Sequence, residues 1–311
     1  MKIVITEPLS ISDAYLQQLA ASLPEGVELT AWPDRTDDAG LIARGKDADI
    51  IVIANQKISD AVLAGWTGLK LLVVAFTGYD HVNVEALRAR GIPVCNCAGY
   101  STSAVADIVF AMAIDLLRNI LLCNEAVRRG GTKDGLVGPE LEGKTFGIIG
   151  TGAIGSRVAR IADAFGCRVI ACSRTEKPGL PLTYLPMEQV LAQSDILSVH
   201  VPSNAATRGM IGEAQLKLMK PSAVLINTAR GPVVDSAALA AALKAGTIAG
   251  AGVDVFNAEP PLPADEPLLS APNTLLTPHI AFATHQAFEK RAVIVFENIL
   301  AWLRGAPQNL V

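Results

Sequence analysis

The feature that most restricts how this chain can fold is a glycine-rich turn in the middle of the sequence. Residues 146–149 form a short apolar run typical of a buried strand, and the pattern GxGxxG follows directly over residues 150–155. Apolar side chains then recur at helical spacing as far as Phe165. A strand, a tight turn and a helix in this order predict a unit that binds the pyrophosphate of a dinucleotide at the helix N-terminus.

Each glycine of this turn has a separate expected role. Gly150 permits the turn, Gly152 lets the backbone approach the pyrophosphate, and Gly155 lets the helix pack closely against its strand. A glycine-rich turn that binds nothing is the alternative. The apolar strand before it and the helical spacing after it favour dinucleotide binding.

The residues after the next strand, 168–172, predict which dinucleotide is bound. An acidic residue at this place would hydrogen bond the ribose 2′-hydroxyl and favour NAD. The sequence has Ser173, Arg174 and Thr175 instead. Because an arginine can bind a 2′-phosphate through two parallel hydrogen bonds, and hydroxyls add donors, we expect NADP(H), with NAD(H) as the alternative. A solvated loop arginine is the other interpretation of Arg174.

The rest of the chain alternates apolar runs with helical segments. Its 311 residues exceed one ordinary domain, and half of them are hydrophobic, which suffices for two cores. The apolar runs at 50–53 and 71–74 are typical of strands in a parallel sheet that is covered on both faces. This alternation predicts doubly wound sheets.

Three further segments shape the expected domain organisation. A long amphipathic helix begins with Ser101 or Thr102 as its cap and is expected to end near residues 128–131. A second series of strands and helices then runs from Lys144 to about residue 282, and residues 286–303 form a last helix.

Composition excludes several classes of protein. The formal net charge is −4 without a clustered basic face, so no nucleic-acid partner is expected. The longest apolar stretch, 105–123, contains charged residues, and the N-terminal apolar run is too short for a signal peptide, so no membrane association is expected. The five cysteines show neither disulfide nor zinc spacing, which predicts reduced, buried thiols, a cytoplasmic protein and no metal.

Polar residues follow three later strands of the predicted sheet. Arg230 follows the strand at 223–227, Asp254 and Glu259 follow the strand that begins at 250, and His279 follows the strand at 274–276. Ligands of open α/β sheets bind outside the carboxyl ends of the strands. These side chains are therefore expected to converge beside the cofactor.

With these motifs in order, the chain resembles the NAD(P)-dependent D-2-hydroxyacid dehydrogenase family from end to end. The resemblance rests on the turn at 150–155, the segment 227–231, Asp254 with Glu259-Pro260, and Pro278-His279. It implies an α/β fold of two doubly wound parallel-sheet domains. A Rossmann cofactor domain, residues 98–284, would be inserted into a discontinuous flavodoxin-like substrate domain, residues 1–97 and 285–311.

The resemblance implies that Arg230, Glu259 and His279 are catalytic, and the chemistry of these residue types agrees. Histidine titrates near neutrality and suits the donor that protonates the carbonyl oxygen as hydride reaches the carbon. A glutamate bound to its other ring nitrogen would orient it and raise its pKa. The arginine would bind the substrate carboxylate and polarise the carbonyl. Each residue taken alone has a structural alternative. His279 could be a loop histidine with its hydrogen bonds satisfied, Glu259 could lie in a solvated turn, and Arg230 could cap the following helix.

Further positions follow from the resemblance alone. Backbone amides at Thr77 and Gly78 are implied to hold the substrate carboxylate, and Arg230 and His279 are implied to contact the substrate as well. Further cofactor contacts are implied for Thr102, Ala153, Ile154, Thr228, Ala229, Arg230, Asp254 and His279. The other histidines are interpreted as structural or surface residues.

Local sequence is similar to the glycerate dehydrogenase or hydroxypyruvate reductase branch, although Phe282 stands where many of its members have tryptophan. The implied activity is reversible NAD(P)H-dependent reduction of hydroxypyruvate or glyoxylate to the D-2-hydroxy acid. A D-lactate or 2-ketogluconate type reductase on the same machinery is the alternative, and a dinucleotide-sensing, corepressor-like binding module is a remote one. The family also implies a homodimer through the cofactor domain, with the helix that begins near Ser101 as a candidate contact.

Overall fold

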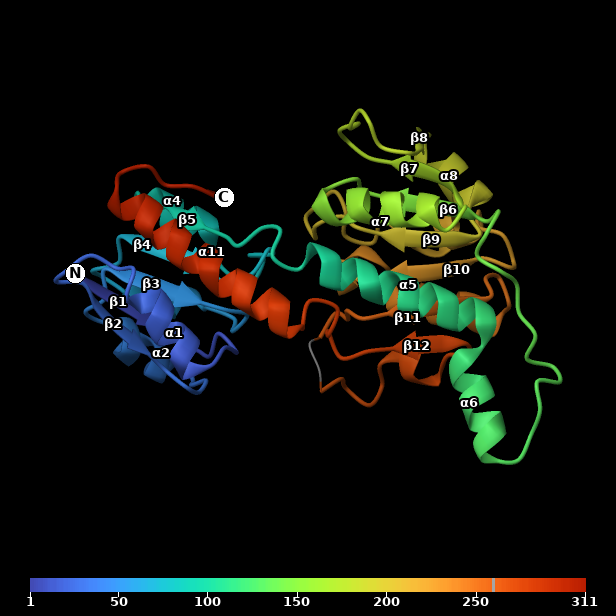
Figure 1. Ribbon diagram of the computed structural model, residues 1–311, viewed down its shortest axis with the longest axis horizontal. Coiled ribbons are helices and arrows are strands. Elements are labelled where there is room, and N and C mark those ends of the chain that lie inside the picture. The colour runs from blue at the N-terminus through green and yellow to red at the C-terminus, as the bar shows by residue number, and fades with distance from the viewer. Residues whose placement is uncertain (259–260) are drawn as a thin grey trace. The chain divides into compact units, whose positions relative to one another are not determined.

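The computed structural model describes residues 1–258 and 261–311 (Figure 1). The chain divides into two compact units, one of Met1–Ser101 with Ala283–Val311 and one of Thr102–Phe282. The expected domain boundaries at residues 97 and 284 differ by a few residues from these divisions at 101 and 282.

The first unit contains a parallel five-stranded sheet in the order β2-β1-β3-β4-β5. This is the flavodoxin-like order. The central strands β3 and β4 are fully buried, as their continuous apolar sequence predicts. The strands are β1 (Lys2–Ile5), β2 (Glu28–Ala31), β3 (Ile50–Ile53), β4 (Leu71–Val74) and β5 (Val94–Cys95).

The helices of this unit come from both ends of the chain. They are α1 (Asp13–Ala20), α2 (Asp38–Gly45), α3 (Asp60–Gly65), α4 (Val84–Ala89) and α11 (His285–Leu303). The last helix, red in Figure 1, contacts β4 and α1. Thr284 caps it by accepting a hydrogen bond from the Ala287 amide. The C-terminal residues then pair with the edge of the sheet, since Leu310 forms a bridge with Cys95.

The second unit contains a parallel seven-stranded sheet in the order β12-β11-β10-β9-β6-β7-β8. Taken in chain order from β6, this is the Rossmann arrangement with one additional strand at its edge. The expected fold class is therefore confirmed. The strands are β6 (Thr145–Ile149), β7 (Arg168–Cys172), β8 (Thr183–Tyr184), β9 (Ile196–Val199), β10 (Val224–Asn227), β11 (Gly250–Val253) and β12 (Thr274–Leu276).

The helices of the second unit flank this sheet. They are α5 (Thr102–Arg118), α6 (Ile120–Arg128), α7 (Ala153–Ala164), α8 (Met187–Gln193), α9 (Glu213–Leu216) and α10 (Ser236–Lys244), with short 3-10 turns at Gly231–Val233 and Pro267–Ser270. The apolar face of α5 is covered by β10, β11 and α7. Gly252 allows this approach, because a Cβ there would lie 2.9 Å from Met112.

One prediction of secondary structure is wrong. The long helix expected from Ser101 to about residue 129 is two helices, separated at Asn119, whose φ is 54°. Asparagine tolerates this left-handed conformation, and its Nδ2 donates to the Leu136 carbonyl at 3.1 Å. The Leu121 amide donates to Asp115 Oδ1 at 2.9 Å, which satisfies a group left unpaired by the break. Apolar spacing continues across the break, so the periodicity alone did not reveal it.

All five cysteines are free thiols. Cys95, Cys97 and Cys167 are buried as expected, whereas Cys123 and Cys172 are only partly buried. Burial raises the pKa of Cys97 to about 12 and that of Cys95 to about 11, which keeps both as unreactive thiols at neutral pH. In the described part of the chain, no helix is both long and apolar enough to cross a membrane.

Candidate functional site

The turn after β6 requires two of its three glycines for reasons internal to the protein. Gly150 has a φ of 95°, and a Cβ there would lie 2.6 Å from the His200 carbonyl oxygen. A Cβ on Gly155 would lie 2.0 Å from the Gly150 carbonyl oxygen. The close contact between these two glycines brings α7 against the end of β6, as the motif predicts.

Gly152 differs, because a Cβ on it would meet no protein atom within 4 Å. It precedes α7, which begins without a side-chain cap. The first amides of a helix have no partner within the helix, and its N-terminus carries partial positive charge. Open space before uncapped amides, at Ala153 and Ile154, fits the pyrophosphate of a dinucleotide.

The loop after β7 is attached to this turn. Ser173 Oγ accepts a hydrogen bond from the Thr151 amide at 3.3 Å. The Tyr184 hydroxyl lies 3.0 Å from Thr151 Oγ1 and accepts a hydrogen bond from the Lys177 amide at 2.8 Å. Sequence analysis missed Tyr184, since the two-residue strand β8 has no recognisable periodicity.

Arg174 and Thr175 lie exposed on the same loop. The Thr175 carbonyl accepts a hydrogen bond from Thr151 Oγ1 at 3.4 Å. Arg174 forms no hydrogen bond or ion pair with another described residue, which leaves its guanidinium open to a ligand.

The segment after β10 is fixed by Asn227. Its Oδ1 accepts from the Ala229 amide and its Nδ2 donates to the Arg230 carbonyl, both at 3.1 Å. Arg230 is half-buried, and its Nη1 donates to the Ala229 carbonyl at 2.7 Å. The buried Thr228 hydroxyl has no hydrogen-bond partner among the described residues. A buried hydroxyl of this kind fits a polar group of a bound cofactor.

His279 has an unusual backbone conformation at the end of β12. Its φ is 56°, in the left-handed region that histidine visits rarely. Its amide donates to the Asp254 carbonyl at 2.9 Å. Its ring meets the ring of Phe282 edge-on, with centroids 5.1 Å apart. Phe282, which stands where many members of the glycerate dehydrogenase branch have tryptophan, therefore contacts the imidazole directly.

The carboxylate of Asp254 holds the backbone on both sides of His279. This side chain is fully buried. It accepts hydrogen bonds from Thr277 Oγ1 at 2.5 Å, the Ile280 amide at 2.8 Å and the Ala281 amide at 2.9 Å. Burial raises the pKa of Asp254, and these hydrogen bonds oppose that rise.

Strand order brings these groups to one edge of the sheet. Asn227 pairs with Val253, and Val253 pairs with Leu276, so the residues after β10, β11 and β12 are neighbours. The glycine turn follows β6, which is separated from β10 by β9 alone. Thr228, Ala229, Arg230, Asp254 and His279 thus share the carboxyl edge with the turn. Glu259 lies outside the described residues.

Thr77 and Gly78 follow β4, at the carboxyl edge of the other sheet. The Thr77 carbonyl accepts a hydrogen bond from Asn96 Nδ2 at 2.8 Å, and the Phe76 carbonyl accepts one from the Cys97 amide at 2.9 Å. The loop is therefore tied to the residues that follow β5. Thr102 is the first residue of α5, in the cofactor-binding unit.

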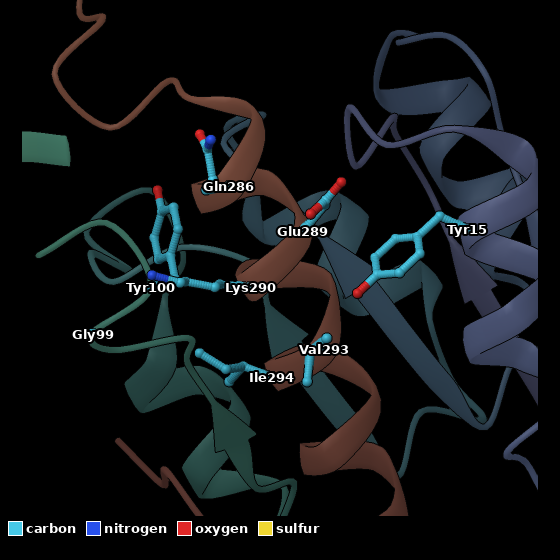
Figure 2. A pocket seen from close by; sticks show the side chains of 8 residues that line it. All are labelled: Tyr15, Gly99, Tyr100, Gln286, Glu289, Lys290, Val293 and Ile294. Carbon is cyan, nitrogen blue, oxygen red and sulfur yellow. The ribbon is translucent and has the colours of Figure 1, made fainter. Parts of the chain in front are cut away.

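A separate hollow of about 380 Å³ contains none of the expected site residues (Figure 2). Most of its lining projects from α11, with Tyr15 opposite. Its lining residues are Tyr15, Gly99, Tyr100, Gln286, Glu289, Lys290, Val293 and Ile294. Within the described ranges, no group of three or more histidine, cysteine, aspartate or glutamate side chains could hold a metal ion.

Comparison with known proteins agrees with this geometry. The family described as D-isomer specific 2-hydroxyacid dehydrogenase, NAD binding domain, matches residues 110–281. The chain belongs to this family. It is 40% identical over 299 residues to a glyoxylate reductase of Thermococcus litoralis, covering 92% of this chain and 90% of the relative. It is also 40% identical over 281 residues to a glycerate dehydrogenase of Methylorubrum extorquens, covering 87% and 88%.

Solved structures support the same assignment. An NADPH-dependent glyoxylate/hydroxypyruvate reductase from Sinorhizobium meliloti, in complex with NADP and malonate, has a TM-score of 0.85 and 34% identity, over 100% of this chain and 96% of that one. An acyclic imino acid reductase in complex with NADPH and D-Arg has a TM-score of 0.92 and 32% identity, over the whole of both chains. As a member of this family, the protein is a nicotinamide-dinucleotide-dependent oxidoreductase.

Substitution by alanine should have different effects at Gly152 and at Gly155. Gly155→Ala places a Cβ against the Gly150 carbonyl and should lower the free energy of unfolding by about 1–3 kcal/mol, measured by denaturant titration. Gly152→Ala meets open space and should leave stability within about 0.5 kcal/mol, yet weaken dinucleotide binding by about tenfold or more. Unchanged dinucleotide affinity in Gly152→Ala, by fluorescence titration, would contradict pyrophosphate binding at this turn.

Proposed function

We propose that this enzyme reduces glyoxylate or hydroxypyruvate to the corresponding D-2-hydroxy acid. The observation that carries the proposal is the placement of His279, held by Asp254 at the same sheet edge as Arg230 and the glycine turn. The relatives named glyoxylate reductase and glycerate dehydrogenase support this choice of substrate. The reaction is reversible, with the direction set by substrate and cofactor concentrations.

The bound nicotinamide supplies the hydride, and the protein supplies binding, orientation and charge. We assign the pyrophosphate to the amides of Ala153 and Ile154, where the uncapped start of α7 favours an anion. The Thr228 hydroxyl, buried without a partner among the described residues, is assigned to the nicotinamide end of the cofactor. Asp254 acts there through the loop that it holds, since its carboxylate accepts three hydrogen bonds from that loop.

His279 delivers the proton to the carbonyl oxygen of the substrate and removes it in the oxidation direction. Arg230 binds the oxygen atoms of the substrate and stabilises the negative charge that develops on the carbonyl. Glu259 is assigned as the partner of the imidazole from sequence alone, because it lies outside the described residues. The amides of Thr77 and Gly78 are assigned to the substrate carboxylate.

Reduction of a 2-imino acid is a second candidate reaction, and the same assay can test it. The acyclic imino acid reductase shares the fold with this chain at a TM-score of 0.92, and a 2-imino acid presents the same carboxylate beside a C=N bond. D-lactate and 2-ketogluconate type reduction are further alternatives. Adding ammonium to a keto acid would generate the imine in solution and separates the imine reaction from the carbonyl reaction.

The decisive assay follows oxidation of reduced nicotinamide with glyoxylate, hydroxypyruvate, pyruvate and 2-ketogluconate, each with and without ammonium. We expect turnover with the first two acids and no requirement for ammonium. His279→Ala should lower kcat by about a hundredfold or more and leave cofactor affinity unchanged, whereas exposed His285→Ala should keep wild-type kcat. Full activity of His279→Ala would refute the assigned proton donor.

We also propose that NADP(H) is preferred over NAD(H). The support is the exposed Arg174 on the loop that Ser173 and Tyr184 attach to the phosphate turn. The Sinorhizobium meliloti structure contains NADP, and a related D-isomer specific 2-hydroxyacid dehydrogenase from Lactobacillus delbrueckii contains NAD, so the family accommodates both.

Exchanging the charge at Arg174 tests this preference. Arg174→Asp should lower the ratio of kcat/KM with NADPH to kcat/KM with NADH by about tenfold or more, through loss of a charge-assisted contact and repulsion of the 2′-phosphate. Arg168→Asp, at the amino end of β7, makes the same change of charge away from the turn and is the control. An unchanged ratio in Arg174→Asp would show that this residue does not read the 2′-phosphate.

We propose a homodimer through the cofactor-binding unit, with α6 as its central contact. The long helix expected to form this contact corresponds to α5 and α6, and α5 is largely covered by its own sheet and by α7. Exposed apolar side chains instead gather on α6, which extends away from the sheet in Figure 1. They are Ile120, Leu121, Leu122 and Val127. An apolar helix face of this kind favours burial against a second copy. A cytoplasmic location is proposed from the free thiols.

Light scattering tests the dimer directly. The wild type should have twice the chain mass of 32.6 kDa, and Leu121→Glu combined with Val127→Glu should give the monomer mass. Leu218→Glu, which changes an exposed leucine after α9, should leave the dimer intact. A wild-type mass of 32.6 kDa at micromolar concentration would refute the proposal.

A further inference from the structure

Arg291, in α11, is a buried cation that forms no ion pair with any described residue. Only 2% of its surface is exposed. No carboxylate of the described residues forms a salt bridge with it, and its Nε has no hydrogen-bond partner. Burial of an uncompensated charge is costly, so a residue of this kind calls for a specific explanation.

The guanidinium is held by the Leu9 carbonyl, by a side-chain hydrogen bond with Tyr100 and by aromatic rings. Its Nη2 donates to the Leu9 carbonyl at 2.6 Å. Its central carbon lies 4.9 Å from the ring centroids of Phe76 and Phe288 and 5.9 Å from that of Tyr100. Such cation–π contacts offset part of the lost hydration without supplying a negative charge.

The nearby ionisable groups do not supply a dedicated counter-charge. Burial lowers the pKa of Arg291, and Tyr100, Cys97 and Glu7 oppose that effect. The carboxylate of Glu7 accepts hydrogen bonds from the Ala54 amide, the Gln56 amide and Arg35. The Glu7 carboxylate therefore already has hydrogen-bond partners at the carboxyl ends of β1 and β3. The positive charge of Arg291 stays available to an anion bound nearby.

The groups that hold the guanidinium belong to the edge where a ligand is expected. Leu9 lies in the loop after β1 and Phe76 in the loop after β4, and both strands neighbour β3 in the parallel sheet. Both loops therefore leave the carboxyl edge, where open α/β sheets bind ligands. Phe76 directly precedes Thr77 and Gly78, so a contact that fixes its ring restrains the backbone that leads into those two amides.

We propose that Arg291 is a positioning and specificity residue, which fixes the Phe76–Gly78 loop and supplies positive charge for the carboxylate of the substrate. The inference rests on the proposed function, in which Thr77 and Gly78 bind that carboxylate. Arg291 contacts the loop through Phe76 and acts on the substrate through it. A carboxylate bound at this loop would be the counter-charge that the described residues lack.

Three variants separate positioning from general stability. Arg291→Met removes the charge and the donor while keeping a long side chain, and Arg291→Lys keeps the charge but loses the planar fork. Arg90→Met is the matched control. Its guanidinium donates to the Leu63 and Trp66 carbonyls in the same unit, away from the Thr77 loop. Free energies of unfolding of all three are measured by denaturant titration.

Hydrogen exchange tests positioning without any substrate. Segment 75–80 should exchange faster by about tenfold or more in Arg291→Met than in the wild type, and at the wild-type rate in Arg90→Met. Equal protection of segment 75–80 in Arg291→Met and the wild type would overturn the positioning role. If Arg291→Met does not fold, Arg291→Lys is compared with the wild type, and a faster exchange confined to this segment is again required.

Kinetics test the role in carboxylate binding. In Arg291→Met the KM for glyoxylate should rise by about tenfold or more, with NADPH affinity unchanged, and Arg291→Lys should restore part of the loss. A KM equal to that of Arg90→Met, or no restoration by lysine, would overturn the specificity role. If the wild type reduces no keto or imino acid, the proposed function fails, and the exchange comparison still decides whether Arg291 positions the loop.

Discussion

The contact between Gly155 and the Gly150 carbonyl is the constraint on which the cofactor-binding unit depends. A Cβ on Gly155 would lie 2.0 Å from the Gly150 carbonyl oxygen, so α7 can lie against the end of β6 only because Gly155 lacks a side chain. This approach directs the uncapped amides of α7 at the space before Gly152. The neighbouring strands then bring the ends of β10, β11 and β12 to the same edge. The residues proposed for cofactor binding and for proton transfer therefore follow strands of one sheet.

Buried polar groups position the residues that we propose as catalytic on this sheet. Asp254 uses its carboxylate to hold the backbone around His279, and Asn227 holds the segment that carries Arg230. A buried polar network offsets its desolvation cost when every polar atom has a hydrogen-bond partner, and it then favours a single conformation. The left-handed φ of 56° at His279 shows that the surrounding hydrogen bonds, more than the preference of histidine, decide this geometry.

The other unit shows the complementary use of a buried charge. Arg291 lies among aromatic rings and donates to the Leu9 carbonyl, and Asn96 holds the same loop through the Thr77 carbonyl. The helix that carries Arg291, α11, is the last helix of the chain. Residues separated by more than two hundred positions thus define the loop assigned to the substrate carboxylate, which explains why this unit needs the C-terminal helix.

The sequence by itself determined the buried strands, the alternation with helices, the glycine turn and the polar residues at strand ends, because these depend on near neighbours in the chain. Tertiary structure alone decided the break at Asn119, the attachment of the 173–177 loop through Tyr184, the hydrogen bonds of Asp254 and the burial of Arg291. Each of these depends on a partner distant in sequence, such as Leu136 for Asn119 and Leu9 for Arg291. The spacing of residue types along the sequence cannot predict such partners, because they come into contact only when the sheets and helices pack.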